Sequence, residues 1–196
     1  MDQKELNYYF ANFWHSTTDH YIYSGMTIID KIQPDDEVID VGCGRNQFKK
    51  HINKLTGIDP ARDEADIKCT IEDFNPKLKF DVALCLGSIN FGDYENIANQ
   101  INKLNDLLHP CARVFWRLNP GQHDHNNRMH NHIPQCDDLE LFPWTFDLLN
   151  GFAKEYQFEQ INCAIDSNGE HTRLYAEWIR GFQPGLESNP IPSLCP

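Results

Sequence analysis

The sequence predicts an α/β fold: a doubly wound, mostly parallel sheet of seven strands with a C-terminal antiparallel hairpin. First, short apolar runs that end in an acid or a glycine alternate with segments of helical periodicity, which is typical of parallel sheets covered by helices. Second, the last two apolar runs are separated by a short turn segment with Asn168-Gly169, which indicates a hairpin. Third, 196 residues suffice for one domain and not for two ordinary ones.

The expected strands and helices follow from these runs in chain order. Before the hairpin, five strands are expected at residues 37–41, 54–59, 67–71, 80–86 and 112–118. Helices are expected at residues 46–53, 94–108 and 143–156, and the hairpin strands at 158–165 and 172–179. The middle helix has apolar residues at helical intervals and ends before Pro110, because the residue preceding a proline leaves the helical region.

Composition divides the chain into a central domain and flanking segments. Residues 1–33 form an unusually aromatic N-terminal cap segment, residues 34–180 carry the predicted sheet, and residues 181–196 form a Pro-rich tail. Within the domain, a polar loop rich in His and Asn spans residues 122–143 after the fifth strand. This loop and the N-terminal segment are expected to cap the same side of the sheet.

The charge balance argues against two classes of partner. Seventeen basic and 29 acidic residues give a net charge of −12, which disfavours non-specific binding to nucleic acid or to an anionic membrane. No apolar stretch approaches the roughly 20 residues of a membrane span. The polar start does not resemble a signal peptide, so a cytoplasmic protein is expected.

The cysteines and histidines do not follow a metal-binding or disulfide pattern. The seven cysteines are scattered without a C-x-x-C pair, which argues against a disulfide framework and a zinc knuckle. Those in apolar runs are expected to be small, reduced core residues: Cys43, Cys69, Cys85, Cys111 and Cys163. Histidines gather at residues 123–132, but the surrounding asparagines favour a solvated loop, so no metal is expected.

The most informative stretch is the glycine turn after the first strand. Asp40 lies near the end of that strand, Gly42 and Gly44 allow a sharp bend, and a short helix then begins. Helix starts offer unpaired N–H groups, and Asp59 at the end of the next strand can accept hydrogen bonds from both hydroxyls of a ribose. This arrangement is typical of nucleoside binding at the carboxyl ends of parallel strands.

Two departures from the dinucleotide-binding fingerprint narrow the ligand class. That fingerprint requires G-x-G-x-x-G, and Gln47 stands at its third glycine position. In addition, the carboxylate of Asp40 would repel a pyrophosphate but attract an amino group. The turn therefore favours a ligand with a cationic amino-acid moiety over NAD.

Taken together, these motifs resemble the Rossmann-like S-adenosylmethionine-dependent methyltransferases over roughly residues 36–180. The resemblance is carried by residues 40–44 (DVGCG), 57–59 (GID), 80–88 (FDVALCLGS) and 107–114 (LLHPCARV), where Cys111-Ala112 replaces the glycines of the family's Pro-Gly-Gly turn. It implies the same sheet, S-adenosylmethionine as the cofactor, and methyl transfer by in-line displacement to an O or N atom.

The resemblance also implies roles for individual residues. Asp40 and the backbone around Gly42 and Cys43 would hold the methionine part of the cofactor, Gly44 would allow its close approach, and Asp59 would bind the ribose hydroxyls. The other cofactor-binding candidates would lie along the adenine or beneath the sulfonium: Pro60, Thr70, Ile71, Glu72, Leu86, Gly87 and Ser88.

The ends of the fourth and fifth strands are where an acceptor would meet the cofactor. Four catalytic candidates stand there: Ser88, Asn90, Arg117 and Asn119. No obligatory catalytic residue is expected, because in-line transfer chiefly needs nucleophile and methyl held in line. The acidic charge favours a small-molecule acceptor. The alternatives are a non-catalytic S-adenosylmethionine-binding protein and, less favoured, an NAD-dependent oxidoreductase.

Several aromatic residues admit two interpretations. Trp14, Tyr21 or Tyr23 would either face the sulfonium, since aromatic faces attract cations, or belong to an amphipathic segment packed on the sheet. Trp116 and Trp178 lie within predicted strands and are expected in the core. These two interpretations decide whether the N-terminal segment is a lid or only part of the fold.

Overall fold

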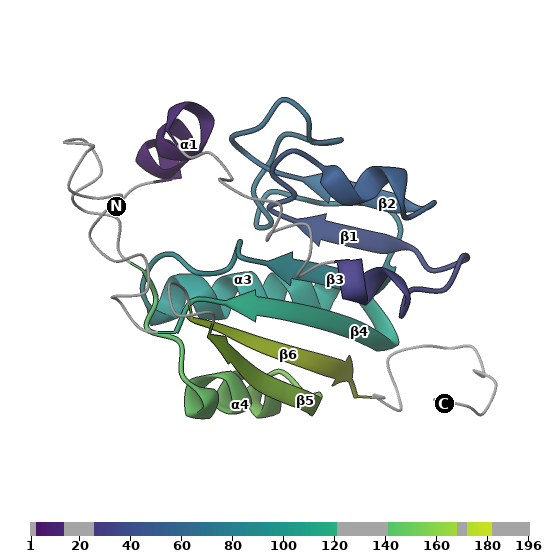
Figure 1. Cartoon of the computed structure of the whole chain (residues 1–196), viewed down its shortest axis with the longest axis vertical. Helices are drawn as coiled ribbons and strands as arrows, with labels where there is room; N and C mark the ends of the chain where they lie inside the picture. Colours follow the sequence, from purple (N-terminus) through teal and green to yellow (C-terminus); the bar gives the residue numbers. More distant parts are fainter. Residues whose placement is uncertain (1–2, 14–25, 121–140, 168–171, 182–196) are drawn as a thin grey trace.

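The computed structural model describes residues 3–13, 26–120, 141–167 and 172–181 (Figure 1). The described elements are α1 (Gln3–Asn12), β1 (Val38–Val41), η1 (Gln47–Lys50), β2 (Leu55–Ile58), β3 (Phe80–Leu86), α3 (Tyr94–Leu107), β4 (Leu108–Leu118), α4 (Phe146–Glu155), β5 (Phe158–Ser167) and β6 (Thr172–Arg180). Residues 26–29 are also helical. Trp14, Tyr21, Tyr23, residues 121–140 and residues 182–196 lie outside the described residues.

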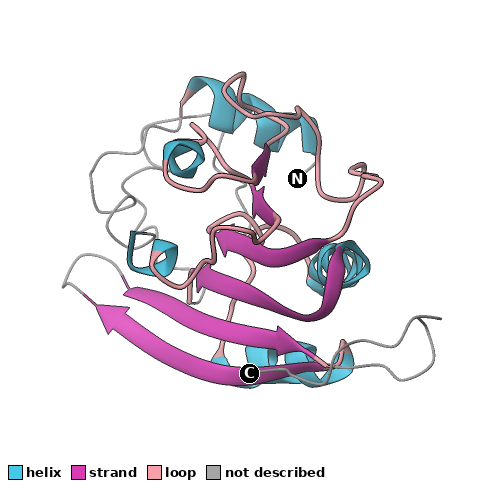
Figure 2. Cartoon of the chain, turned by 90° about the vertical axis from the view of Figure 1, so that its right-hand side faces the viewer, coloured by secondary structure: helices cyan, strands magenta, loops and turns pink. Residues whose placement is uncertain are grey.

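The strands form one mixed sheet in the order β2-β1-β3-β4-β6-β5. β1 runs parallel to β2 and β3, and β3 runs parallel to β4, whereas β6 is antiparallel to both β4 and β5. Figure 2 shows β5 and β6 as the long pair at one edge of the sheet. The carboxyl ends of β1, β3 and β4 therefore meet on one side of the molecule, where α1 also lies (Figure 1).

Within the described residues the sheet has six strands and not the seven that we predicted. Residues 67–71, predicted as a strand, contribute only one parallel bridge, between Ile58 and Ile67. The reason lies in Thr70, whose hydroxyl oxygen accepts the Asp73 N–H at 3.3 Å while its hydroxyl group donates to the Asp73 carboxylate at 3.0 Å. Such local side-chain bonds compete with a strand ladder and turn the chain away.

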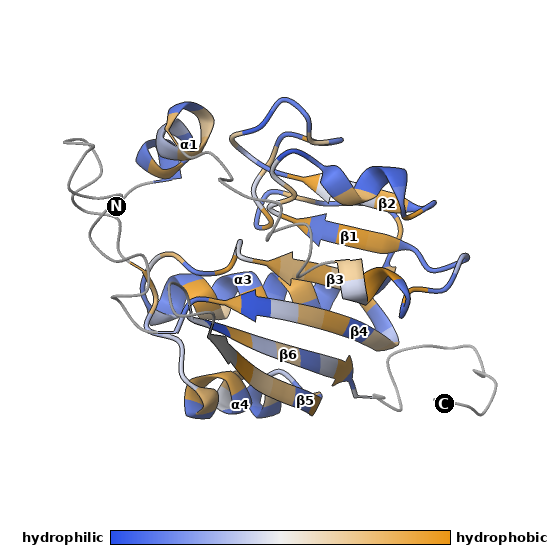
Figure 3. Cartoon of the chain, in the orientation of Figure 1, coloured by the Kyte–Doolittle hydropathy of each residue, from blue (hydrophilic) through white to orange (hydrophobic). Residues whose placement is uncertain are grey.

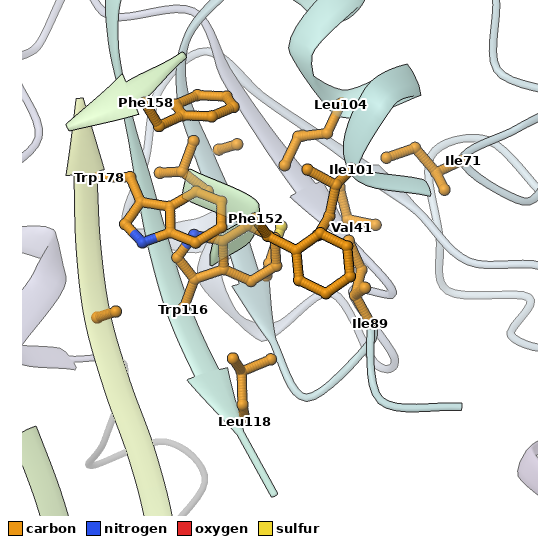
Figure 4. Packing of buried hydrophobic residues seen from close by; sticks show 14 of the residues in the cluster. Val41, Ile71, Ile89, Ile101, Leu104, Trp116, Leu118, Phe152, Phe158 and Trp178 are labelled. Atoms are coloured by element: carbon orange, nitrogen blue, oxygen red, sulfur yellow. The ribbon is translucent and has the colours of Figure 1, made fainter. Parts of the chain in front are cut away.

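The face of the sheet under α3 and α4 carries the larger apolar core. Trp116 of β4 and Trp178 of β6 are both buried, as predicted, and their ring centroids lie 4.7 Å apart. Ile101 and Leu104 of α3 and Phe152 of α4 pack in the same cluster (Figure 4). Figure 3 shows largely hydrophobic β1 and β3 against hydrophilic loops, as expected for strands buried on both faces.

The opposite face has a smaller core beneath η1 and the helical residues 26–29. Phe48 of η1, Ile28, Leu84 of β3 and Phe115 of β4 pack together there. Because Phe115 and Trp116 are neighbours in one strand, their side chains point to opposite faces of the sheet. Helical segments thus cover both faces, which confirms the predicted doubly wound arrangement.

The helix α3 begins with a reciprocal capping box. Asp93 accepts the Asn96 N–H at 2.9 Å, and the Asn96 side chain accepts the Asp93 N–H at 3.2 Å. Asp93→Ala is expected to lower the free energy of unfolding by about 1 kcal/mol, because the Asn96 N–H loses its side-chain acceptor. Urea unfolding measures this loss. Asp106→Ala, an exposed acid at the other end of α3, is the control, and an equal loss in both variants would contradict the capping role.

The start of β4 differs from the prediction in two ways. The strand begins at Leu108, directly after α3, and not at Ala112, with a register irregularity opposite residues 80–82. Cys111 adopts φ +62° in this stretch, is half-buried and is disulfide-bonded, so the prediction that it is a reduced core residue is wrong. The reason is the left-handed backbone, which takes its side chain out of the regular alternation of the strand. The other described cysteines are free.

Candidate functional site

The chain turns sharply where β1 ends, and three left-handed residues make the turn. Gly42, Gly44 and Asn46 have φ values of +66°, +56° and +53°. The N–H groups of Gly42 and Cys43 donate to the Ile58 carbonyl at 2.8 and 3.0 Å, which ties the turn to the end of β2. In place of the predicted helix at 46–53, only the single 3₁₀ turn η1 follows.

The two glycines of the turn have different surroundings. A Cβ on Gly42 would lie 2.4 Å from the Ser88 Cβ, so this glycine allows β1 and the end of β3 to approach each other. A Cβ on Gly44 would meet no atom of the described residues within 4 Å. Gly44 therefore borders open space at the carboxyl end of the sheet. A residue in this position allows a ligand to approach the backbone closely.

Asp59 organises the loop that faces this turn. One carboxylate oxygen accepts the Gly44 N–H at 3.0 Å, and the other accepts the N–H groups of Ala61 at 2.8 Å and Arg62 at 3.1 Å. A carboxylate has about four acceptor positions, so it retains capacity for a ligand hydroxyl. The sequence indicated Asp59 as a ligand-binding residue but not its second role as the acceptor that shapes the loop.

Asp59→Ala is expected to lower the free energy of unfolding by about 2 kcal/mol, because three backbone N–H groups lose a charged acceptor. Thermal unfolding measures the change. Asp63→Ala is the control in the same loop: Asp63 is exposed and contacts Lys68, and little change is expected. If the two variants unfold alike, the bonds to Asp59 do not stabilise the loop.

Asp40 lies beneath the turn with 3% of its surface exposed. Burial, and secondarily the negative charge of Asp59, raise its pKa to about 7. A buried carboxyl of this kind gains from a cation placed beside it, because the cation stabilises the ionised form. The site therefore combines an acid that favours a cationic group with a second acid, Asp59, that is already engaged by N–H donors.

The predicted adenine-side residues have unequal access to a ligand. Pro60 and Thr70 are half-buried and Glu72 is exposed, but the Ile71 side chain belongs to the apolar core, so only its backbone can contact a ligand. The Thr70 hydroxyl is already bonded to Asp73. Among these residues, Pro60 and Glu72 keep the greatest freedom to contact a ligand.

Asp66 is a residue of this region that the sequence reasoning missed. Its carboxylate accepts the Gly57 N–H and the Lys49 ammonium, each at 2.8 Å. Burial alone would raise its pKa, but these two hydrogen bonds lower it. Asp66 thus ties the loop after β2 to η1. No local motif marks it, because its partners lie 9 and 17 residues away in the sequence.

The end of β3 brings three predicted residues toward the glycine turn. Leu86 packs in the smaller core, and Gly87 has φ +106°. The buried Ser88 hydroxyl oxygen has no hydrogen-bond partner in the part of the chain that the structure describes. Because a Cβ on Gly42 would meet Ser88, the end of β3 lies next to the glycine turn. That these residues lie beneath the sulfonium stays a prediction.

Two of the four catalytic candidates are hydrogen-bonded to each other. The Asn119 N–H donates to the side-chain oxygen of Asn90 at 3.0 Å, which joins the ends of β3 and β4. Arg117, two residues earlier on β4, lies opposite Leu86 of β3 and Tyr175 of β6. Ser88, Asn90, Arg117 and Asn119 therefore share the carboxyl edge of β3 and β4, as predicted.

The N-terminal helix covers part of this edge. The Phe10 ring of α1 meets the Phe91 ring edge-on, with their centroids 5.4 Å apart, and Phe91 directly follows Asn90. Tyr9 is buried. The predicted lid residues Trp14, Tyr21 and Tyr23 and the histidines at 123–132 lie outside the described residues. The described part of the N-terminal segment thus packs at the carboxyl edge.

In the described ranges, no three His, Cys, Asp or Glu residues are grouped so that they can hold a metal ion. None of the described helices has both the length and the apolar character needed to cross a bilayer.

Comparisons with known proteins give matches in structure but not in sequence. No family profile and no curated protein matches the sequence. The 1,6-didemethyltoxoflavin-N1-methyltransferase of Burkholderia thailandensis, with its substrate and S-adenosylhomocysteine bound, has a TM-score of 0.71 at 14% identity, over 91% of this chain and 88% of that one. The magnesium protoporphyrin IX methyltransferase of Synechocystis with bound S-adenosylmethionine has a TM-score of 0.68 at 13% identity, over 92% and 98%.

A third match has a similar extent. The N-methyltransferase NodS of Bradyrhizobium japonicum with S-adenosylhomocysteine has a TM-score of 0.63 at 14% identity, over 90% of this chain and 97% of that one. At these identities the likeness concerns the fold. The chain therefore has the Rossmann-like fold of the class I S-adenosylmethionine-dependent methyltransferases.

Proposed function

We propose that the chain binds S-adenosylmethionine and transfers its methyl group to an O or N atom of a small-molecule acceptor. The observation that carries the proposal is the pair of acids around an open glycine turn. Asp40 is buried and Asp59 is fixed by backbone N–H groups, while Gly44 between them borders open space. Structural neighbours with S-adenosylmethionine or S-adenosylhomocysteine bound support the ligand class.

The proposed roles follow from the position of each residue. Asp40 attracts the cationic amino group of the methionine part, Gly44 leaves room for it, and Asp59 accepts from the ribose hydroxyls. The remaining cofactor contacts are assigned to Cys43, Gly42, Pro60, Thr70, Ile71, Glu72, Leu86, Gly87 and Ser88. When bound, the cofactor supplies a methyl carbon that is already activated by a sulfonium.

On the acceptor side, the chain has to hold the nucleophile of the acceptor in line with the methyl group of the cofactor. Asn90 and Asn119 fix the ends of β3 and β4 to each other, which gives the acceptor a rigid floor. The structural neighbours methylate 1,6-didemethyltoxoflavin and magnesium protoporphyrin IX according to their names, which supports a small-molecule acceptor.

Calorimetric titration of the full chain with S-adenosylmethionine, S-adenosylhomocysteine and NAD tests the cofactor. Micromolar binding of both adenosyl ligands is expected, and NAD is expected not to bind, because Gln47 replaces the third glycine. Binding of NAD alone, or of none of the three, would overturn the proposal. Gly44→Ala is a better control than Asp59→Ala, because Asp59 also supports its loop.

Transfer is tested with a radiolabelled methyl group and a fractionated small-molecule extract. Label that appears in an extract component supports the enzyme. Tight binding of the cofactor with no transfer to any fraction would favour the alternative of a non-catalytic binding protein.

A further inference from the structure

Cys111, near the start of β4, has a disulfide partner outside the described residues. Cys111 is disulfide-bonded, whereas the other described cysteines are free: Cys43, Cys69, Cys85 and Cys163. Because the chain has seven cysteines, only Cys136 and Cys195 can be the partner. The described residues from which each of these two segments departs decide between them.

The register of β4 and β6 brings the start of the C-terminal tail beside Cys111. Arg113 of β4 lies opposite Ile179 of the antiparallel β6. The same register, continued by two residues, places Gly181 opposite Cys111. Cys195 follows Gly181 by 14 residues, and the entropic cost of closing a loop grows only slowly with its length. The tail is therefore long enough to bring Cys195 back to Cys111.

The end of β6 is fixed in this place by hydrogen bonds. The Arg180 guanidinium donates to the Asn105 side-chain oxygen at 2.7 Å and to the Leu108 carbonyl. The Gly181 N–H donates to the Gln157 carbonyl at 2.8 Å. Figure 1 shows this end of β6 beside the start of β4, at the opposite end of the strands from the carboxyl ends of β1 and β3. The tail thus leaves the fold at the amino edge of β4.

The segment that contains Cys136 returns to the fold at the carboxyl edge, where Leu141 is bridged to Phe91. The five residues from Cys136 to Leu141 span at most about 18 Å. From Cys111 to the end of β4 at Leu118 the strand is about 23 Å long. Cys136 would reach Cys111 only by running straight along β4, which is paired with β3 and β6 on its edges and packed in the two cores on its faces. The fold therefore favours Cys195.

We propose that Cys195 forms the disulfide with Cys111 and so attaches the C-terminal tail, residues 182–196, to the amino edge of the sheet. The bond forms by exchange with a small-molecule disulfide. The thiolate of one cysteine attacks that disulfide and releases one small thiol, and the thiolate of the other cysteine then displaces the second. Two electrons thus pass to the small-molecule disulfide, which is reduced to two thiols. This redox modification lies far from the proposed cofactor site and does not depend on the proposed function.

Peptide mapping of the full chain identifies the partner. The protein is oxidised with glutathione disulfide, its free thiols are alkylated, and a tryptic digest is analysed by mass spectrometry without reduction. Cleavage after Lys and Arg places the three cysteines in three peptides, residues 104–113, 129–154 and 181–196. We expect the Cys111 peptide to be linked to the Cys195 peptide. A link between the Cys111 and Cys136 peptides, or a Cys111 peptide linked to neither, would overturn the proposal.

The bond is also expected to stabilise the fold. In the unfolded chain it closes a loop of about 85 residues, whereas in the folded chain only the tail after Gly181 has to close. Dithiothreitol is therefore expected to lower the urea midpoint of the wild type by about 0.5–1 M. The midpoint of Cys195→Ser is expected not to respond to dithiothreitol, whereas the matched variant Cys136→Ser responds as the wild type does. A wild-type midpoint that dithiothreitol leaves unchanged, or the opposite behaviour of the two variants, would contradict the assigned bond.

Discussion

Gly44→Ala is expected to leave the chain folded and to weaken S-adenosylhomocysteine binding about 10- to 100-fold. At φ +56° an alanine costs about 1–2 kcal/mol of stability. Among the described residues the added methyl meets no atom within 4 Å, so it enters the open space in which we place the methionine part. Insertion of a methyl into a filled site costs about 1–3 kcal/mol, which corresponds to the stated loss of affinity.

Gly42→Ala is the matched variant. We expect it to lower the stability of the fold more than Gly44→Ala does. Its φ of +66° imposes a similar backbone cost, but its Cβ would lie 2.4 Å from the Ser88 Cβ. β1 and the end of β3 would have to separate, and we expect a loss of about 3 kcal/mol in the free energy of unfolding. Urea unfolding and calorimetric titration of both variants measure the two effects.

The comparison of the two variants decides between a binding turn and a merely structural one. If Gly44→Ala binds S-adenosylhomocysteine as the wild type does, the open space beside Gly44 is not the cofactor site. If Gly42→Ala is as stable as Gly44→Ala, the contact between Gly42 and Ser88 does not hold the two strand ends together. Either result would contradict the geometry from which we argue.

Local signals in the sequence predicted much of the fold and the centre of the site. The first strand, the glycine turn and Asp59 lie within about 20 consecutive residues, and each is marked by residue type: buried apolar runs, glycines at left-handed positions, an acid at a strand end. Trp116 and Trp178 were predicted in the core because both lie within apolar runs that were predicted to form strands of the sheet.

Two kinds of feature were not predictable in this way: a local side-chain bond that overrides a strand pattern, and contacts between residues that are distant in the sequence. The expected strand at 67–71 has suitable residues, but the bonds between Thr70 and Asp73 turn it away. The bond between the Asn119 N–H and the Asn90 side-chain oxygen spans 29 residues, and no local pattern in the sequence marks it. The contact between Asn119 and Asn90 became visible only when the topology placed β3 beside β4.

Asp40→Asn is expected to abolish a pH dependence of cofactor binding that the wild type shows. Because burial and the charge of Asp59 raise the pKa of Asp40 to about 7, its carboxyl is protonated in the free protein below that pH. A cationic amino group beside it favours the ionised form, so binding releases a proton. Affinity for S-adenosylhomocysteine is therefore expected to fall by up to about tenfold per pH unit below 7 and to be flat just above it.

Calorimetry in two buffers of different ionisation enthalpy counts that proton. In the wild type at pH 6, release approaching one proton per ligand is expected, and in Asp40→Asn none. An affinity in the wild type that is unchanged between pH 5.5 and 7.5 would show that Asp40 does not face the ligand's cation.

The pH dependence of folding stability in the free protein is an independent test. Stability is expected to fall as the pH rises, whereas affinity for S-adenosylhomocysteine is expected to rise. Between pH 4 and 7 the folded state holds a proton on Asp40 that the unfolded state, with its ordinary pKa near 3.8, has lost. Stability must therefore decrease as the pH rises through this window, by a few kcal/mol at most. Asp40→Asn lacks this decrease, so relative to the wild type it gains stability from pH 5 to pH 8. Above pH 7, the ionised Asp40 would thus destabilise the free protein and strengthen cofactor binding. Such a carboxyl serves ligand binding and not the stability of the fold.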